Sequence, residues 1–309
     1  MINKNDENRN SILVHYSPYS FLNTLDSGVL LEKTVFEPIC KDLINEETQC
    51  YKIEINNISY EFLVKFLKWD TDYFKIPTYK LQLVLFDDEK YSNLKQACKE
   101  FIRVFFDEKK YCFCEIPSED IKVIQALNEA GFKLVENRLT YYLDLGNFNF
   151  ERFETRSASI DDSTNLMRVA REMRNPYDRF HSDNVYDPQL ADEFLATYIQ
   201  ESLKGFADYT IVPAGDGVEP DAFVTAKYLI DQWSLIEEKI SLMVLSAVSS
   251  KTCKGWYVKL ISEMAYHLRE QGANYAFMHP ATTNRAVIHS YEKLGCKYGK
   301  CVHVLTYLS

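Results

Sequence analysis

A tyrosine close to the C-terminus is the residue best suited to acid–base chemistry in this sequence. Tyr291 lies in NRAVIHSYEKLGC (284–296), where Asn284 precedes a helical pattern and Leu-Gly ends it. A phenol, whose pKa is ordinarily about 10, can give a proton to a leaving group of similar basicity. A core side chain could equally occupy this helix position, so the surrounding segments must decide between the two interpretations.

A turn between a buried strand and a helix forms a second candidate site. The segment SSKTCKGWY (249–257) follows the apolar run EKISLMVLSAV and precedes the helical pattern YVKLISEMAYHLREQG. Backbone amides at a helix start have no partner inside the helix, and the helix dipole favours an anion there. Gly255 permits close backbone approach, while Lys251 and Lys254 add positive charge. The turn therefore predicts a phosphate site, although ordinary surface loops share this composition.

A polar and aromatic loop, NPYDRFHSDNVY (175–186), carries the third group of candidates. His181, with an ordinary pKa of about 6.5, could accept a proton from an incoming substrate. A water-mediated path through Asp178 or Asp183 is an equal alternative. Arg179 and Phe180 could hold the phosphate and the base of a nucleotide. Solvated loop side chains are the competing interpretation for this whole group.

The segments that would position these residues alternate between strand and helix patterns. The stretch LGNFNFERFE (145–154) separates two halves, so we expect domains at 1–148 and 149–309. The second half contains, in order, a strand, two helices, three strands, a helix, a strand, a helix and a strand. This order predicts an α/β fold built on a mixed sheet. Residues 1–60 carry no interpretable motif.

A weak internal repeat relates the two halves. The segment 119–145 can be laid over 284–309 so that Gly131 falls on Gly295, with helix, glycine and aromatic strand in the same order. Leu127 of the first copy then aligns with Tyr291 of the second. Because leucine satisfies packing in the first copy, the phenol in the second copy favours a chemical role.

Taken in order, these motifs resemble those of the GNAT (GCN5-related N-acetyltransferase) superfamily over about residues 62–309. Its patterns V-x-x-x-x-R-x-x-G-x-G/A and N-x-x-A-x-x-x-Y-x-K-x-G-F correspond to Val248, Thr252, Gly255 and Tyr257, and then to Asn284, Ala286, Tyr291, Lys293, Gly295 and Cys296. The stretch WDTDYFKIP (69–77) resembles the opening of the TDP-fucosamine acetyltransferase group of tandem proteins. Thr252 stands where the family usually has Arg or Gln, and Tyr257 where it has Gly or Ala. A tyrosine at this helix start could crowd the pyrophosphate or point away from it, so these departures bear on cofactor affinity more than on the fold.

The resemblance implies two GNAT-like halves, each a mixed, mainly antiparallel twisted sheet flanked by helices, with the N-terminal half degenerate. It implies metal-free transfer of acetyl from acetyl-CoA to a primary amine of a small molecule, such as a nucleotide-linked amino sugar, by direct attack. Tyr291 would be the general acid, His181 a candidate base, and Arg179 and Phe180 substrate contacts. The acetyl-CoA contacts would be Ser246, Ala247, Val248, Thr252, Cys253, Lys254, Gly255, Trp256, Tyr257, Asn284 and Lys293. Among these, the strand residues 246–248 would form an oxyanion hole.

Composition limits the partners. A net charge of −10 and a pI near 5.2 give no basic surface for nucleic acid or anionic lipid. The polar start and the absence of an apolar run of about 18 residues favour a cytoplasmic protein outside the membrane. The eight cysteines lack zinc spacing and are expected to be free thiols. The sequence leaves three alternatives. The protein could form a homodimer, it could use another acceptor or donor (a peptide or an aminoacyl group), or it could be a non-catalytic binding protein.

Overall fold

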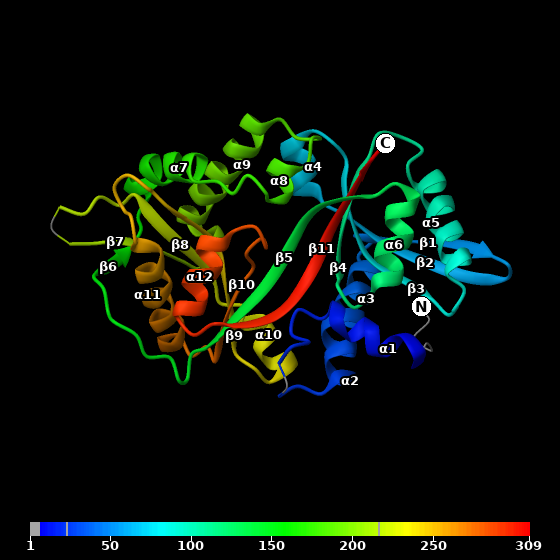
Figure 1. Ribbon diagram of the computed structural model, residues 1–309, viewed down its shortest axis with the longest axis horizontal. Coiled ribbons are helices and arrows are strands. Elements are labelled where there is room, and N and C mark those ends of the chain that lie inside the picture. The colour runs from blue at the N-terminus through cyan, green and yellow to red at the C-terminus, as the bar shows by residue number, and fades with distance from the viewer. Residues whose placement is uncertain (1–6, 23, 216) are drawn as a thin grey trace. The chain divides into compact units, whose positions relative to one another are not determined.

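The computed structural model describes residues 7–22, 24–215 and 217–309, which fold into two compact units (Figure 1). One unit contains the chain up to Arg138 together with Lys300–Ser309, and the other contains Leu139–Gly299. The sequence had placed the division at 148/149. The difference arises because β5 (Lys133–Asp144) ends in the second unit, while β11 (Lys297–Leu308) carries the chain back into the first.

The first unit contains a mixed, mainly antiparallel sheet with the strand order β1-β2-β3-β4-β11. All neighbours are antiparallel except β3 and β4, which run parallel. Its strands before β11 are β1 (Thr48–Ile55), β2 (Ile58–Phe66), β3 (Thr78–Phe86) and β4 (Tyr111–Pro117). Its helices are α1 (Glu7–Leu13), η1 (Val14–Tyr16), α2 (Ser27–Leu30), η2 (Leu31–Phe36), α3 (Glu37–Ile44), α4 (Lys68–Phe74), α5 (Tyr91–Phe105) and α6 (Ile121–Ala130).

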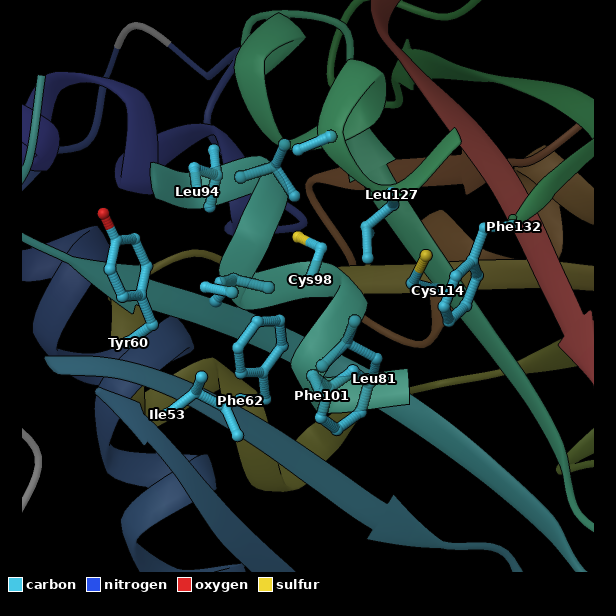
Figure 2. Close-up of a cluster of buried hydrophobic side chains, with 14 of the residues drawn as sticks. Ile53, Tyr60, Phe62, Leu81, Leu94, Cys98, Phe101, Cys114, Leu127 and Phe132 are labelled. Atoms are coloured by element: carbon cyan, nitrogen blue, oxygen red, sulfur yellow. The ribbon is translucent and has the colours of Figure 1, made fainter. Parts of the chain in front are cut away.

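Two hydrophobic clusters cover the two faces of this sheet. On one face, α5 and α6 bury their apolar stripes, and Figure 2 shows Phe101 of α5 against Phe62 of β2, with Leu127 of α6 in the same cluster. The Phe62 and Phe101 rings are stacked, with centroids 4.3 Å apart. On the other face, Leu31, Val35 and Phe36 of η2 belong to a cluster with strand residues. The N-terminal segment, which carries no sequence motif, is thus part of the packed unit.

The second unit contains another mixed, mainly antiparallel sheet, with the order β5-β10-β9-β8-β7-β6. Only β9 and β10 run parallel. Its further strands are β6 (Thr155–Ser157), β7 (Tyr209–Pro213), β8 (Ala222–Lys227), β9 (Ile240–Val248) and β10 (Tyr275–Met278). Its helices are η3 (Ile160–Asp162), α7 (Ser163–Glu172), α8 (Arg179–Ser182), α9 (Pro188–Glu201), η4 (Ser202–Phe206), α10 (Ile230–Ile236), α11 (Trp256–Glu270) and α12 (Arg285–Lys293).

Alternating strand residues separate the two faces of the second sheet. Val224 and Met243 share a core with α11 and α12, whereas Phe223 and Ala247 share a core with α7 and α9. The mixed α/β class is confirmed. The expected strands and longer helices of the second half are present, but the expected order lacked the short helices α8, before α9, and α10, which separates β8 from β9. No helix among the described residues has both the length and the apolarity needed to cross a bilayer.

Candidate active site

The candidate site is built where β9 and β10 separate. These parallel strands pair from Ile240 with Tyr275 to Leu242 with Phe277, and β10 ends one residue later while β9 continues to Val248. At the other edge of β9, the register with β8 shifts by one residue. Val244 and Leu245 of β9 together face the single residue Thr225 of β8, which defines a β-bulge. The bulge bends β9 beside the point where its pairing with β10 stops.

The bulge fixes the direction of the β9 amides. The Thr225 hydroxyl accepts the Leu245 N–H at 3.0 Å and donates to the Leu245 carbonyl at 3.2 Å. The Ser249 N–H donates to the Asp221 carbonyl at 2.9 Å, so Leu245 and Ser249 both face the β8 side. Because neighbouring strand residues point their backbone groups in opposite directions, Ser246 and Val248 turn theirs toward the edge that β10 has left. Two amides in that position can bind a carbonyl oxygen.

Tyr291 lies beside the same point. Its side chain is 5% exposed and belongs to a core cluster with Met243 and Met278, which follow the last paired residues of β9 and β10. Its hydroxyl is 2.8 Å from the Tyr257 hydroxyl. Burial raises the pKa of Tyr291 well above its ordinary value, and neighbouring Tyr257 raises it further. Tyr291 is therefore protonated at neutral pH.

The turn before α11 is partly closed by its own hydrogen bonds and open at Gly255. The N–H groups of Lys251 and Thr252 donate to Ser249 Oγ at 3.3 and 3.4 Å, and those of Cys253 and Trp256 donate to backbone carbonyls within the turn. Gly255 precedes the first residue of the helix with φ of 86°, and a side chain built on it would meet no atom within 4 Å. No side chain caps this helix start. The exposed Lys251 and Lys254 add positive charge. Tyr257, which the sequence suggested could crowd this turn, directs its hydroxyl into the unit toward Tyr291 instead.

Thr252 binds a carboxylate beside the turn. Its hydroxyl donates to Asp221 Oδ2 at 2.8 Å, and Arg168 Nη2 donates to Asp221 Oδ1 at 2.7 Å. The negative charge of Asp221 is thereby compensated close to the candidate anion site. Cys253 is fully buried, with Sγ 3.4 Å from the Glu219 carbonyl, so only its backbone faces the turn.

The remaining expected cofactor contacts lie around the two helices. Asn284 caps α12, and its Oδ1 accepts the Val287 N–H at 3.4 Å. Lys293 is exposed in the last turn of α12. The Trp256 ring is covered by the Lys259 ammonium, 4.7 Å from its centroid. The structure thus brings Ser246, Tyr257 and Tyr291 into one connected group and places the turn at the head of the same helix.

The loop residues proposed for base and substrate roles are engaged elsewhere. The His181 ring is held between Asp178 Oδ1, 2.8 Å from Nδ1, and Asp192 Oδ1, 3.1 Å from Nε2. Burial lowers the His181 pKa, but these two carboxylates outweigh it and raise the pKa above the ordinary value. A histidine with both ring nitrogens on carboxylates is poorly suited to act as a base. Arg179 is buried with its guanidinium over the Phe180 ring, which packs on Phe194.

A histidine that the sequence analysis passed over lies closer to the strand ends. His279 directly follows β10, and its Nδ1 is 3.1 Å from the hydroxyl of the buried Thr140. The ring is exposed. The available sequence signal was a histidine immediately after the short strand that precedes the Asn284 helix. No group of three His, Cys, Asp or Glu side chains in the described part of the chain could hold a metal ion.

The first unit has the same strand separation, but its space is filled. β3 and β4 pair only from Thr78 with Tyr111 to Leu81 with Cys114, and Gln82 is the extra residue of a bulge against β2. Tyr16 from the N-terminal segment lies here, and the cavity that it lines together with Leu127 and strand residues measures only about 10 Å³. Such a cavity holds at most one water.

The loop before α5 also differs in charge from the turn before α11. It contains Asp87, Asp88 and Glu89, and Asp88 accepts hydrogen bonds from Tyr60, at 2.5 Å, and Asn93, at 2.8 Å. A cluster of carboxylates repels phosphate groups. The candidate site therefore belongs to the second unit.

Comparison with known proteins places this fold. No family model matches the chain, and no curated protein matches its sequence. An N-acetyltransferase of the GCN5-related class from Sphaerobacter thermophilus aligns at 9% identity over 80% of this chain and 76% of that one, with a TM-score of 0.52. A GNAT-family acetyltransferase from Colwellia psychrerythraea aligns at 13% identity over 92% and 97%, with a TM-score of 0.50.

A third similar structure is part of a fungal protein. The GCN5-related glucosamine N-acetyltransferase region of a multi-domain GH3 β-N-acetylglucosaminidase aligns at 10% identity over 99% of this chain and 37% of that one, with a TM-score of 0.53. At sequence identities of 9–13%, the similarity to these three structures concerns the fold alone. The chain has a GNAT-like fold, mixed and mainly antiparallel in its strands, with helices on the flanks.

Proposed function

We propose that this chain is an N-acetyltransferase that transfers acetyl from acetyl-CoA to a primary amine of a small molecule. The observation that carries the proposal is the separation of β9 from β10 with Tyr291 beside it. The open turn before α11 supports it, since Gly255 leaves room for a phosphate group and the uncapped helix start favours an anion.

Each part of the site has one task in this reaction. The turn from Thr252 to Tyr257 binds the pyrophosphate of CoA through its backbone, with charge from Lys251 and Lys254. The amides of Ser246 and Val248 bind the thioester carbonyl and stabilise the negative charge that forms on its oxygen. Tyr291 gives its phenolic proton to the departing thiolate. Removing one amide-type donor of this kind typically costs about 10²–10³ in rate.

The incoming amine must lose a proton before it attacks. His279 suits this task better than His181, because it follows β10 directly and its ring is oriented through the Thr140 hydroxyl. An amino sugar, free or nucleotide-linked, is the acceptor class we favour. Support comes from the WDTDYFKIP stretch and from the fungal neighbour, which is described as a glucosamine N-acetyltransferase.

The test combines donor binding with turnover. The purified chain should bind acetyl-CoA in a calorimetric titration and release CoA thiol in the presence of amino sugars or amino-sugar nucleotides. Tyr291→Phe should lower kcat by about 10²-fold or more, in the range lost with a general acid, while the melting temperature changes little.

Tyr141→Phe is the matched control, since Tyr141 packs beside Tyr291 with ring centroids 5.8 Å apart but bonds Glu292 instead. We expect its turnover to stay within about twofold of the wild type. A stable Tyr291→Phe protein with unchanged kcat would remove the general-acid role. An absence of acetyl-CoA binding at millimolar ligand would indicate a different donor or a binding protein.

A further inference from the structure

Three hydroxyls from three different elements form a chain inside the second unit. Ser246 of β9 donates its Oγ–H to the Tyr257 hydroxyl at 3.3 Å, and the Tyr257 hydroxyl of α11 lies 2.8 Å from the Tyr291 hydroxyl of α12. The two rings are tilted by 45° with centroids 6.0 Å apart, so they are not stacked. What joins the two tyrosines most directly is the contact between their hydroxyls.

The two phenols differ in how well each can carry a negative charge. A phenolate oxygen accepts hydrogen bonds and donates none. As a phenolate, Tyr257 would accept hydrogen bonds from both Ser246 and Tyr291, whereas the hydroxyl contact shown for Tyr291 is the one with Tyr257. Tyr257 also lies in the first turn of α11, the end of a helix that favours negative charge. Tyr257, the middle residue of the three hydrogen-bonded hydroxyls, is therefore the better site for the negative charge.

The acidities of the two phenols agree with this geometry. Burial raises the pKa of Tyr257, but the hydrogen bonds from Ser246 and Tyr291 act to lower it. Burial raises the pKa of Tyr291 well above its ordinary value, and Tyr257 adds to that rise. Of the two phenols, Tyr257 gives up its proton more readily.

We propose that Tyr257 is a second proton-transfer residue. It supplies a proton to Tyr291 after Tyr291 has given its own proton to the thiolate. The inference rests on the proposed function and adds a residue to it. The Tyr291 O–H bond breaks as the S–H bond of the thiol forms. The Tyr257 proton then moves to the Tyr291 oxygen, and the negative charge stays on Tyr257, held by hydrogen bonds from Ser246 and Tyr291. A proton from solvent restores Tyr257 after the thiol leaves.

The test compares Tyr257→Phe and Ser246→Ala with the wild type, with Tyr141→Phe as control. Tyr257→Phe should lower kcat by about tenfold to a hundredfold. The KM for acetyl-CoA should stay within about twofold, because the turn is expected to bind the pyrophosphate through its backbone, whereas the Tyr257 hydroxyl contacts Tyr291. In the wild type, Tyr257 is the first of the two phenols to lose its proton, whereas in Tyr257→Phe that proton must come from Tyr291, whose pKa burial alone holds well above the ordinary value. The fall of kcat at high pH should therefore move to higher pH in Tyr257→Phe. Ser246→Ala should also move the high-pH fall of kcat to higher pH, but by a smaller amount than Tyr257→Phe.

A second variant keeps the shape of the phenol. Fluorotyrosine placed at position 257 is more acidic than tyrosine and nearly the same size, so it should move the high-pH fall of kcat to lower pH without changing the melting temperature. A packing role for Tyr257 would leave the pH profile unmoved by this substitution, and an active Tyr257→Phe protein with the wild-type profile would likewise overturn the inference.

The outcome also separates this inference from the proposed function. Wild-type protein that releases no thiol with any amine overturns the proposed function, and the relay with it. Wild-type protein that is active, with inactive Tyr291→Phe and fully active Tyr257→Phe, overturns the relay alone.

Discussion

Gly255 is the residue on which binding of the CoA pyrophosphate should depend most directly. Gly255→Glu places a carboxylate and a side chain in the open space before α11, where the phosphates are expected. We expect acetyl-CoA binding to weaken by at least about a hundredfold, since like charges repel strongly at short range. Calorimetric titration of the variant measures this loss.

Gly272 provides the matched control for this substitution. It has φ of 92°, has equally open space in front of it, and follows the other end of α11. Gly272→Glu therefore introduces the same charge and the same backbone strain away from the turn. If both variants bind acetyl-CoA equally well, the turn has been assigned to the wrong ligand.

Several residue identities could be interpreted from the sequence, but the directions of their side chains could not. Tyr291 stood out because the aligned Leu127 shows that packing alone does not require a phenol. Tyr257 looked like an obstacle to phosphate binding, and only tertiary structure shows its hydroxyl on Tyr291. His181 looked available in a polar loop, yet two carboxylates occupy its ring nitrogens. His279 was passed over because a single histidine after a strand carries no pattern of its own.

At the scale of elements, His181 fastens the short helix α8 to α9. Asp178 caps α8 by accepting the amides of Phe180 and His181, and it also binds the His181 ring, whose other nitrogen contacts Asp192 of α9. Because the pKa of His181 is raised in the folded state, the protonated ring stabilises the fold most fully below its unfolded pKa of about 6.5. That stabilisation is lost as the pH rises through the higher folded pKa.

Chemical unfolding between pH 6 and pH 9 would show this dependence. We expect the free energy of unfolding to fall across the window by about 1.5–3 kcal/mol, the range for a hydrogen bond to a charged group. His181→Gln should be less stable at pH 6 and should lose most of the dependence. Wild-type stability that stays constant over the window, or falls equally in the variant, would show that other groups control it.

The strand and helix patterns predicted the longer elements of the second half because alternating and helical periodicities are local properties of the chain. The short helix α10, between β8 and β9, was not predicted. The bulge on β9 was not predictable in the same way. Val244 and Leu245 have ordinary strand-forming side chains, and what accommodates the extra residue is the Thr225 hydroxyl on another strand. The feature that opens the candidate site is therefore a property of strand pairing and is absent from any short segment.

At the scale of the whole molecule, each unit contains one pair of parallel strands that separate beside a bulge, and the two units differ in what lies next to the separated strands. In the first unit, Tyr16 packs beside the separated strands, and its hydroxyl donates to Asp120 at 2.8 Å. Arg9 binds the same buried carboxylate, and the buried Lys300 donates to the carbonyls of His15 and Ser17. The N-terminal segment, which has no motif, thus fills the space beside the separated strands of the first unit.

This difference between the two units predicts the number of acetyl-CoA molecules that one chain binds. Titration should give one site per chain, because the first unit offers a filled space and an acidic loop, where the second offers the uncapped start of α11 and two exposed lysines. Gly255→Glu should remove that single site and leave no weaker one. A second site that survives Gly255→Glu would instead place a ligand in the first unit. Since burying a tyrosine contributes several kcal/mol, such binding would have to displace Tyr16 at a large cost in stability. The filled space of the first unit therefore confines the expected chemistry to residues 139–299.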